Sequence, residues 1–355
     1  MRNETNKPQL SQLVGTYFIK LANLSALIHQ AYAGSDATDI NFFIDVYSIK
    51  KTILRSDFIT SSDNELCSLI MDMVVFYKNY FRGIGVHVNF YIIDSNNVPA
   101  NNRQIFPSYN SDFVIALTSK NVEYIEYNMD LVKILCEYLP DITYIKTKFE
   151  SSVVMADIIG LCGSNWINNK PNIVLSKDPY CMMLVNIDGT GNTTWIRPKK
   201  CKGVDNSYIC STMNLHYIVE HELGVTKMNP EHRTGIGGML SAIFACTKFP
   251  ARCIPPIMQY RTFMSILSEI RNNFFGVSLT DILSSEAIKT KISNDEFDKR
   301  YMVLDIPAQH NFYRSSTEFA VNSNPAPKMT DIEGLKHINN NYFSNNPLML
   351  DDLLR

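Results

Sequence analysis

Short apolar segments that alternate with longer amphipathic ones are the feature that most constrains the fold of this chain. Residues 41–47 (NFFIDVY) and 86–93 (VHVNFYII) are typical of buried strands, whereas residues 65–81 place apolar side chains on one face of a helix. A helix at 129–138 and a buried strand at 172–175 continue the alternation. Strands separated by helices predict right-handed crossovers, and therefore an α/β fold with a mainly parallel sheet flanked by helices.

The pattern changes in the second half of the chain. A strong turn at 188–192 separates the parallel strands from a small predicted hairpin at the sheet edge. Beyond about residue 215 the spacing is mostly helical, and the last residues are rich in Asn and Pro. The organisation predicted from these changes is an N-terminal helical extension (1–40), an α/β domain (41–212), a helical region (213–322) and a loosely held tail (323–355).

Composition narrows the class of protein. The 355 residues carry 33 Lys and Arg against 35 Asp and Glu, a net charge of −2, which argues against a polycation that coats nucleic acid but leaves a local basic face open. The abundance of Asn, with few Ala and Gly, is typical of an AT-rich genome such as that of a phage or large DNA virus. No apolar run is long enough to span a membrane, so we expect a soluble intracellular protein with no membrane partner.

Several aspartates follow the predicted strands. Asp45 and Asp94 end two of them, Asp178 comes shortly after a third, and Asp157 lies on an adjacent predicted helix. Ligands of open parallel sheets bind at the carboxyl ends of the strands, and carboxylates that converge there need a divalent cation to offset their repulsion. The pattern predicts a Mg²⁺ or Mn²⁺ site suited to phosphodiester hydrolysis, although each aspartate taken alone is also explained as a turn or helix cap.

Five motifs in order support a more specific interpretation. Residues 44–48 (IDVYS) match "ID-x-x-S", 90–94 (FYIID) match a second Asp strand, and 156–159 (ADII) match the end of "E-A-D-D-x-I". Residues 176–178 (SKD) match the start of "S-x-D-x-D", and 251–257 (ARCIPPI) lie at the place of "S-D-N-I-P-G-I". In this order the segments resemble the flap endonuclease and 5′→3′ exonuclease family, a branch of the PIN-like nucleases.

The resemblance implies a PIN-like nuclease domain followed by a helical, helix-hairpin-like clamp that binds DNA. It implies a 5′ nuclease that acts on duplex DNA with a 5′ end or flap. The catalytic and Mg²⁺- or Mn²⁺-binding residues would be Asp45, Asp94, Asp157 and Asp178, and Glu150 would supply a further metal ligand if an insertion shifts the motif.

Cations and one tyrosine near these motifs are the predicted DNA contacts. Arg103 and Tyr109 follow the second Asp strand, a basic cluster occupies 197–202, and further cations lie near the clamp. The predicted nucleic-acid-binding residues are Arg103, Tyr109, Lys199, Lys200, Lys202, Lys248 and Arg252. A solvated loop explains the cluster at 197–202 equally well.

The chain also departs from the family pattern. Positions where the family has acidic or basic active-site residues are occupied by Val154, Ala156, Tyr180, Asn110 and Arg252. The alternative is therefore a catalytically inactive nuclease-fold subunit, with a DNA-binding or structural role beside protein partners in a replication, transcription or virion complex. The two interpretations differ in whether the aspartate side chains converge to within roughly 4–5 Å, as shared metal ligands do.

Overall fold

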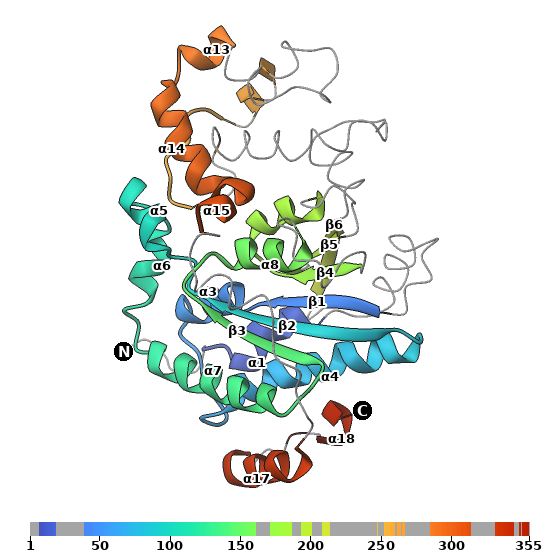
Figure 1. The fold of residues 1–355 in the computed structure, drawn as a ribbon. Helices are drawn as coiled ribbons and strands as arrows, with labels where there is room; N and C mark the ends of the chain where they lie inside the picture. The colour runs from blue at the N-terminus through green and yellow to red at the C-terminus, as the bar shows by residue number, and fades with distance from the viewer. Residues whose placement is uncertain are drawn as a thin grey trace.

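The computed structural model places the chain in three layers, with a sheet between two groups of helices (Figure 1). The residues that it describes are 7–18, 39–160, 171–186, 193–200, 208–213, 247, 252–259, 261–263, 265–266, 285–313, 331–343, 348 and 350–354.

The sheet has six strands in the order β3-β2-β1-β4-β5-β6. Its first five strands run parallel, and β6 pairs antiparallel with β5, as the predicted edge hairpin requires. The strands are β1 (Asp39–Asp45), β2 (His87–Ser95), β3 (Ile142–Thr147), β4 (Asn172–Leu175), β5 (Thr193–Lys200) and β6 (Tyr208–Met213). The predicted mainly parallel α/β sheet is confirmed, and β1 lies at its centre between β2 and β4.

Strand β1 is apolar on both faces because helices cover both sides of the sheet. Phe42 and Ile44 belong to the core on one side, whereas Phe43 packs with Tyr91 on the other. Since partners in a parallel pair share a face, Asp45 points to the same side as Ile93. This alternation decides which layer each strand-end aspartate enters.

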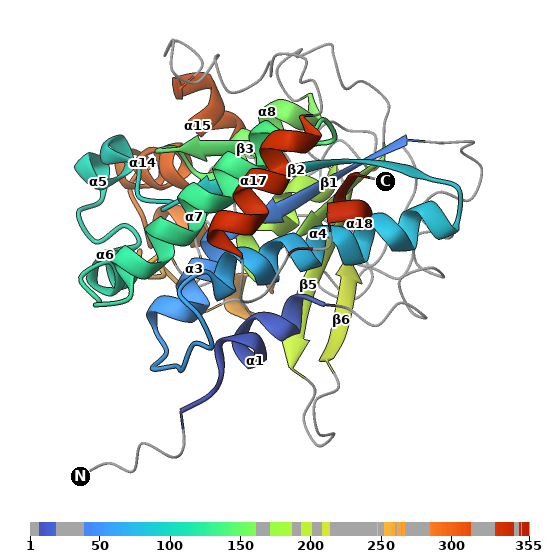
Figure 2. The ribbon, with the colours of Figure 1, turned by 90° about the horizontal axis from the view of Figure 1, so that it is seen from below.

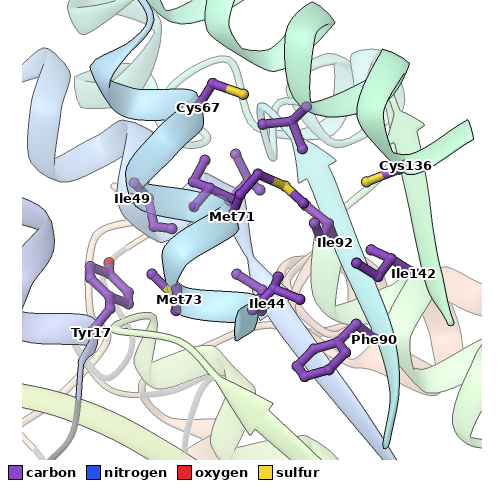
Figure 3. Close-up of a cluster of buried hydrophobic side chains, with 14 of the residues drawn as sticks. Tyr17, Ile44, Ile49, Cys67, Met71, Met73, Phe90, Ile92, Cys136 and Ile142 are labelled. Atoms are coloured by element: carbon purple, nitrogen blue, oxygen red, sulfur yellow. The ribbon is translucent and has the colours of Figure 1, made fainter. Parts of the chain in front are cut away.

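The first face is covered by α3 (Val46–Leu54), α4 (Glu65–Gly83) and α7 (Val122–Glu137). Helices α4 and α7 are seen below the sheet in Figure 1, and Figure 2 shows all three from below. Figure 3 shows how Met71 and Met73 of α4 pack with Ile44, Phe90 and Ile92 of the strands. The short α1 (Leu10–Val14) and the turn η2 (Gly15–Tyr17) pack against the same layer. They are the described part of the predicted N-terminal extension.

The second face is covered by α8 (Ser151–Ile159), the 3₁₀ segment η3 (Pro179–Asn186) and α15 (Ile306–Tyr313). Next to them lie α14 (Asn294–Leu304) and the short α13 (Glu286–Lys289), drawn in orange in Figure 1. Helices α13, α14 and α15 are the largest described part of the predicted helical region 213–322. Most of that region lies outside the described residues. Two more helices, α5 (Ala100–Ile105) and α6 (Ser111–Ala116), follow β2.

The C-terminal segment differs from the predicted loose tail. Its described residues form α17 (Ile332–Tyr342) and α18 (Leu350–Leu354), which bury Leu335, Phe343 and Leu353 in the core of the α4 layer. Gly334 lies so close to the Tyr138 ring at the end of α7 that a Cβ atom there would collide with it. The apolar spacing of the segment, rather than its Asn content, decides its structure. None of the described helices is long and apolar enough to cross a membrane.

Candidate functional site

Three carboxylates meet at the carboxyl edge of the parallel sheet. Asp45 ends β1, Asp178 follows β4, and Glu150 immediately precedes α8. All three side chains are buried. Parallel strands that end side by side explain why Asp45 and Asp178 come together, and α8, which packs on the same face, brings in Glu150.

A single guanidinium lies between two of these carboxylates. Nη2 of Arg252 is 3.0 Å from Glu150 Oε2 and 2.7 Å from Asp178 Oδ2, and the arginine is only 1% exposed. Its charged group also stacks over the Tyr180 ring, 4.6 Å from the centroid. The backbone N–H of Asn110 donates to the Arg252 carbonyl at 2.7 Å, which fixes the residue at this edge. Arg252 is therefore a buried counter-ion inside the carboxylate cluster.

Asp45 is the carboxylate deepest in the sheet. The Ser176 hydroxyl donates to its Oδ2 at 2.5 Å, and burial raises the pKa of Asp45 to about 7, with repulsion from Asp178 adding to the rise. The nearby guanidinium of Arg252 opposes this shift, but it bonds directly to the other two carboxylates. Near neutral pH, Asp45 is therefore poised between its protonated and charged forms.

Glu150 has a similar electrostatic position with different partners. The Tyr109 hydroxyl donates to Oε1 at 2.6 Å while Arg252 bonds Oε2. Burial raises the pKa of Glu150 to about 7 against the attraction of Arg252. With three carboxylates around one guanidinium, a proton held on Asp45 or Glu150 reduces the excess negative charge of the cluster.

Two asparagines in the left-handed backbone region hold the start of α8 in place. Asn97 and Asn110 have φ angles of 48° and 49°, values that asparagine tolerates better than most residues. The Asn97 amide oxygen accepts the backbone N–H of Ser151 at 2.7 Å, and Asn110 Nδ2 donates to the Asn97 carbonyl at 2.9 Å. The loop after β2 thus orients Glu150 through hydrogen bonds to the first turn of α8.

Asp94 does not join this cluster. It enters the opposite layer because its neighbour Ile93 shares a face with Asp45. There its Oδ1 lies 2.5 Å from Lys50 Nζ of α3, and the Tyr144 hydroxyl donates to Oδ2. Asp94 therefore does not converge with Asp45 as predicted, because successive residues of a strand point to opposite faces of the sheet.

Asp157 lies two turns along α8 from the cluster. Its Oδ1 is 3.0 Å from Nε2 of His310 on α15, so it belongs to a helix-to-helix contact and not to the carboxylate edge. The residue that reaches the carboxyl edge of the sheet is Glu150, which directly precedes α8. If Glu150 is the Glu of the "E-A-D-D" motif, the motif covers residues 150–153, four positions earlier than predicted, and Ser152 and Val153 stand where the family has its two aspartates. The sequence feature that could have indicated this alignment is a Glu directly before the first turn of a predicted helix.

Comparison of the whole structure with solved structures finds similar proteins, whereas comparison of the whole sequence finds none. No protein-family model matches the sequence, and no curated protein matches it either. Among solved structures, the 5′-exonuclease of bacteriophage T5 with bound divalent zinc matches with a TM-score of 0.53 and 10% identity over 80% of this chain and 97% of that chain. A T5 protein co-crystallized with metal ions matches with a TM-score of 0.52 and 11% identity, over the same shares of the two chains.

A third match is a T5 flap endonuclease with an Asp→Lys substitution, in a pseudo-enzyme–product complex with DNA and metal ions. Its TM-score is 0.50 at 11% identity, over 80% of this chain and 96% of that chain. The chain has a flap-endonuclease-like fold. At such low identities the likeness defines the fold, so the chemistry of the site has to be judged from its own residues.

The side chains at this edge of the sheet do not fit the predicted divalent ion. Among the described residues, no group of three or more His, Cys, Asp or Glu side chains is arranged to hold a metal. The reason is geometric, since Arg252 lies between Glu150 and Asp178, and Asp94 and Asp157 have other partners. The predicted Mg²⁺ or Mn²⁺ ligand set is therefore not assembled at this edge.

The predicted nucleic-acid contacts of the flap-endonuclease-like chain fall into three groups. Arg103 is exposed on α5, where a phosphate could reach it. Tyr109 and Arg252 are buried inside the carboxylate cluster, so their predicted contact with nucleic acid disagrees with their placement. The remaining side chains, those of Lys199, Lys200, Lys202 and Lys248, lie outside the described part of the structure.

Proposed function

We propose that this protein binds nucleic acid on a flap-endonuclease-like scaffold without cleaving it. The observation that carries the proposal is the position of Arg252, whose guanidinium bonds Glu150 and Asp178 where a hydrolytic site would need a metal ion. Metal-assisted hydrolysis requires a cation that activates water and withdraws charge from the phosphate. A guanidinium bonded to two carboxylates offsets part of their charge but has no open coordination position for water.

The energetics of the cluster support the proposal. Both of its ion pairs are buried, and charge-assisted hydrogen bonds are the strong class of hydrogen bond in proteins. A divalent ion would have to displace Arg252 and leave its guanidinium without a partner in a buried position, a change that is strongly unfavourable. We therefore expect the side chain to compete effectively with Mg²⁺ at ordinary concentrations.

The T5 neighbours support nucleic acid as the partner. One of them, with an Asp→Lys substitution, is described in a pseudo-enzyme–product complex with DNA and metal ions. In this chain a cationic side chain reaches the carboxylates from a distant loop, as Arg252 lies 102 positions after Glu150. A protein with this fold can accordingly be expected to keep DNA as a ligand when its carboxylates are neutralised.

A cleavage and binding assay tests the proposal. Wild-type protein and an Asp45→Ala/Asp178→Ala double variant are incubated with 5′-flap and nicked duplexes in Mg²⁺ and in Mn²⁺, with RNA versions of the same substrates as a further arm. We expect no cleavage that depends on the two aspartates, and binding that weakens as salt is raised. Cleavage by the wild type that the double variant lacks overturns the inactive assignment. Absence of salt-dependent binding overturns the nucleic-acid role and leaves a structural subunit.

A metal-dependent 5′ nuclease is the second candidate. It is favoured by the convergence of Asp45, Glu150 and Asp178 at one edge, and it requires Arg252 to leave that edge before an ion can enter. Cleavage in Mg²⁺ that disappears in an Asp178→Asn variant, while that variant still binds the substrate, would establish this candidate.

A further inference from the structure

A cavity lined by three cations opens beside the carboxylate cluster. It has a volume of about 260 Å³ and lies between α3 and the segment that follows β4. On the helix it is lined by Ser48, Lys51, Thr52 and Arg55, and Lys177 faces them from the other wall. The helical residues are spaced i, i+3, i+4 and i+7, so one face of α3 presents two of the cations to the cavity.

The positive charge of the cavity exceeds its negative charge. Asp178 also lines it, but the Arg252 guanidinium and the Tyr180 backbone N–H already bond its two oxygens. Asp112 pairs with Arg55 and lies 3.8 Å from Lys51 Nζ. Three cations and one carboxylate, that of Asp178, therefore line the cavity.

Lys177 is the cation with the fewest partners. Among the described residues it forms no ion pair, and its ammonium lies over the Tyr17 ring, 4.5 Å from the centroid. Lys51 and Lys177 line the same cavity, so an anion bound there would interact favourably with both ammonium groups.

The size and charge of the cavity limit the ligand. Its volume is below the range of about 300–1,000 Å³ that is typical of pockets for drug-sized molecules. Three cations on its walls match the dianionic form of a phosphate monoester better than the single charge of a backbone diester. The hydroxyl hydrogens of Ser48 and Thr52 are donated to the carbonyls of Asp45 and Ser48, which leaves the three cations as the donors.

We propose that this cavity binds a phosphate monoester, with Lys51, Arg55 and Lys177 as the contacting residues. Two sources carry this group: the 5′-terminal phosphate of a nucleic-acid strand, and a free mononucleotide or inorganic phosphate. The strand form rests on the proposed nucleic-acid function, whereas the phosphate site itself does not.

Two versions of one oligonucleotide, which differ only at the 5′ end, test the proposal. The affinity of the full-length protein for a 5′-phosphorylated strand is compared by fluorescence anisotropy with its affinity for the same strand bearing a 5′-hydroxyl. Inorganic phosphate and AMP are tested as competitors. We expect the phosphorylated strand to bind about tenfold more tightly or better, the gain typical of one or two charge-assisted hydrogen bonds. Lys177→Gln and Lys51→Gln should remove most of this preference.

Two further variants make the test specific. Lys336→Gln removes the same charge from an exposed position on α17 and should leave the preference unchanged. Asp112→Asn removes the one competing carboxylate and should strengthen phosphate binding, a gain that a misfolded variant could not produce. Equal affinities of the two strands, with no saturable binding of phosphate or AMP, overturn the proposal.

The outcomes separate this proposal from the proposed function. Salt-dependent duplex binding with no phosphate preference overturns the cavity assignment alone. Binding of inorganic phosphate or AMP that Lys177→Gln abolishes, without binding of any nucleic acid, supports the cavity with the free ligand and overturns the nucleic-acid role.

Discussion

The two faces of the sheet each bury carboxylates beside a cation, but with different charge balances. On the α8 side, Asp45, Glu150 and Asp178 share the single guanidinium of Arg252. On the α3 side, Asp94 pairs with Lys50, which also lies 3.5 Å from the partly exposed Glu126. Glu126 also pairs with Lys146, so Lys50 is left to balance the buried Asp94, whereas three buried carboxylates around one cation leave negative charge in excess. This excess is the reason why we place the proposed function on the α8 face.

The largest expected effect comes from removing the cation on the α8 face. Arg252→Ala leaves Glu150 and Asp178 buried without their partner, and should lower the free energy of unfolding by about 3–5 kcal/mol. Lys50→Ala is the matched change on the other face, where Asp94 keeps the hydrogen bond from Tyr144, so its cost should be smaller. Urea denaturation measures both. A larger loss for Lys50→Ala than for Arg252→Ala would reverse the comparison.

The next effect concerns metal binding. With Arg252 replaced by Ala, the three carboxylates lose their competitor, and Mn²⁺ should stabilise the variant by about 2–3 kcal/mol at a hundredfold excess over its Kd. Thermal unfolding with and without Mn²⁺ measures this, and the wild type should show little response. An Asp45→Asn/Arg252→Ala variant is the control, since it keeps the vacated position but loses a ligand. Equal stabilisation of wild type and Arg252→Ala would show that the guanidinium does not block the ion.

The pH dependence of stability follows from the raised pKa values on the α8 face. Asp45 and Glu150 titrate near pH 7 when folded, above the value of about 4 for such groups in an unfolded chain. The folded state therefore binds more protons in this range, and the stabilising contribution of these groups is complete below about pH 4 and lost as the pH rises through about 7. Denaturant unfolding between pH 5 and 8 should show a shallower fall for Asp45→Asn than for the wild type. Identical slopes would indicate that Asp45 is ionised throughout.

The smallest expected effect lies outside both buried clusters. Arg103 is exposed on α5, and Arg103→Gln should weaken duplex binding modestly and uniformly across sequences. The slope of log affinity against log salt should decrease in magnitude by about one if the residue contacts a single phosphate. Anisotropy titrations at several salt concentrations measure the slope. An unchanged slope would place Arg103 away from the nucleic acid.

The sequence predicted the sheet better than the site. Buried strands such as β1 are visible as continuous apolar runs, since a strand covered on both faces has no polar side. The predicted strand at 41–47 extended two residues too far, because Val46 and Tyr47 begin α3. Which face an aspartate enters depends on strand parity at its last residue, and for Asp94 that parity is set by its pairing with β1. To place Glu150 at the site from the sequence, the first residue of α8 would have to be predicted to within one position. Helix boundaries are the least certain part of a sequence-based assignment.

The position of Arg252 inside the carboxylate cluster could not be predicted from its local sequence. Its neighbours in sequence resemble a clamp motif, and the cation was accordingly predicted to face nucleic acid. Its contacts with Glu150 and Asp178 depend on a long-range approach of two chain segments, which periodicity does not encode. The loss of acidic residues at nearby positions was the only hint that the carboxylates had acquired another partner.

The distance between Arg252 and its partners along the chain also has a consequence for synthesis. The ribosome releases Asp45, Glu150 and Asp178 well before Arg252, which follows Glu150 by 102 positions. Domains fold as their residues emerge, so the nascent sheet can bring its carboxylates together while their counter-ion is still untranslated. During that interval the positive charges available to them are protons, dissolved cations and earlier groups such as Lys51. The edge that the arginine closes in the finished protein is therefore open to ions while the chain is being made.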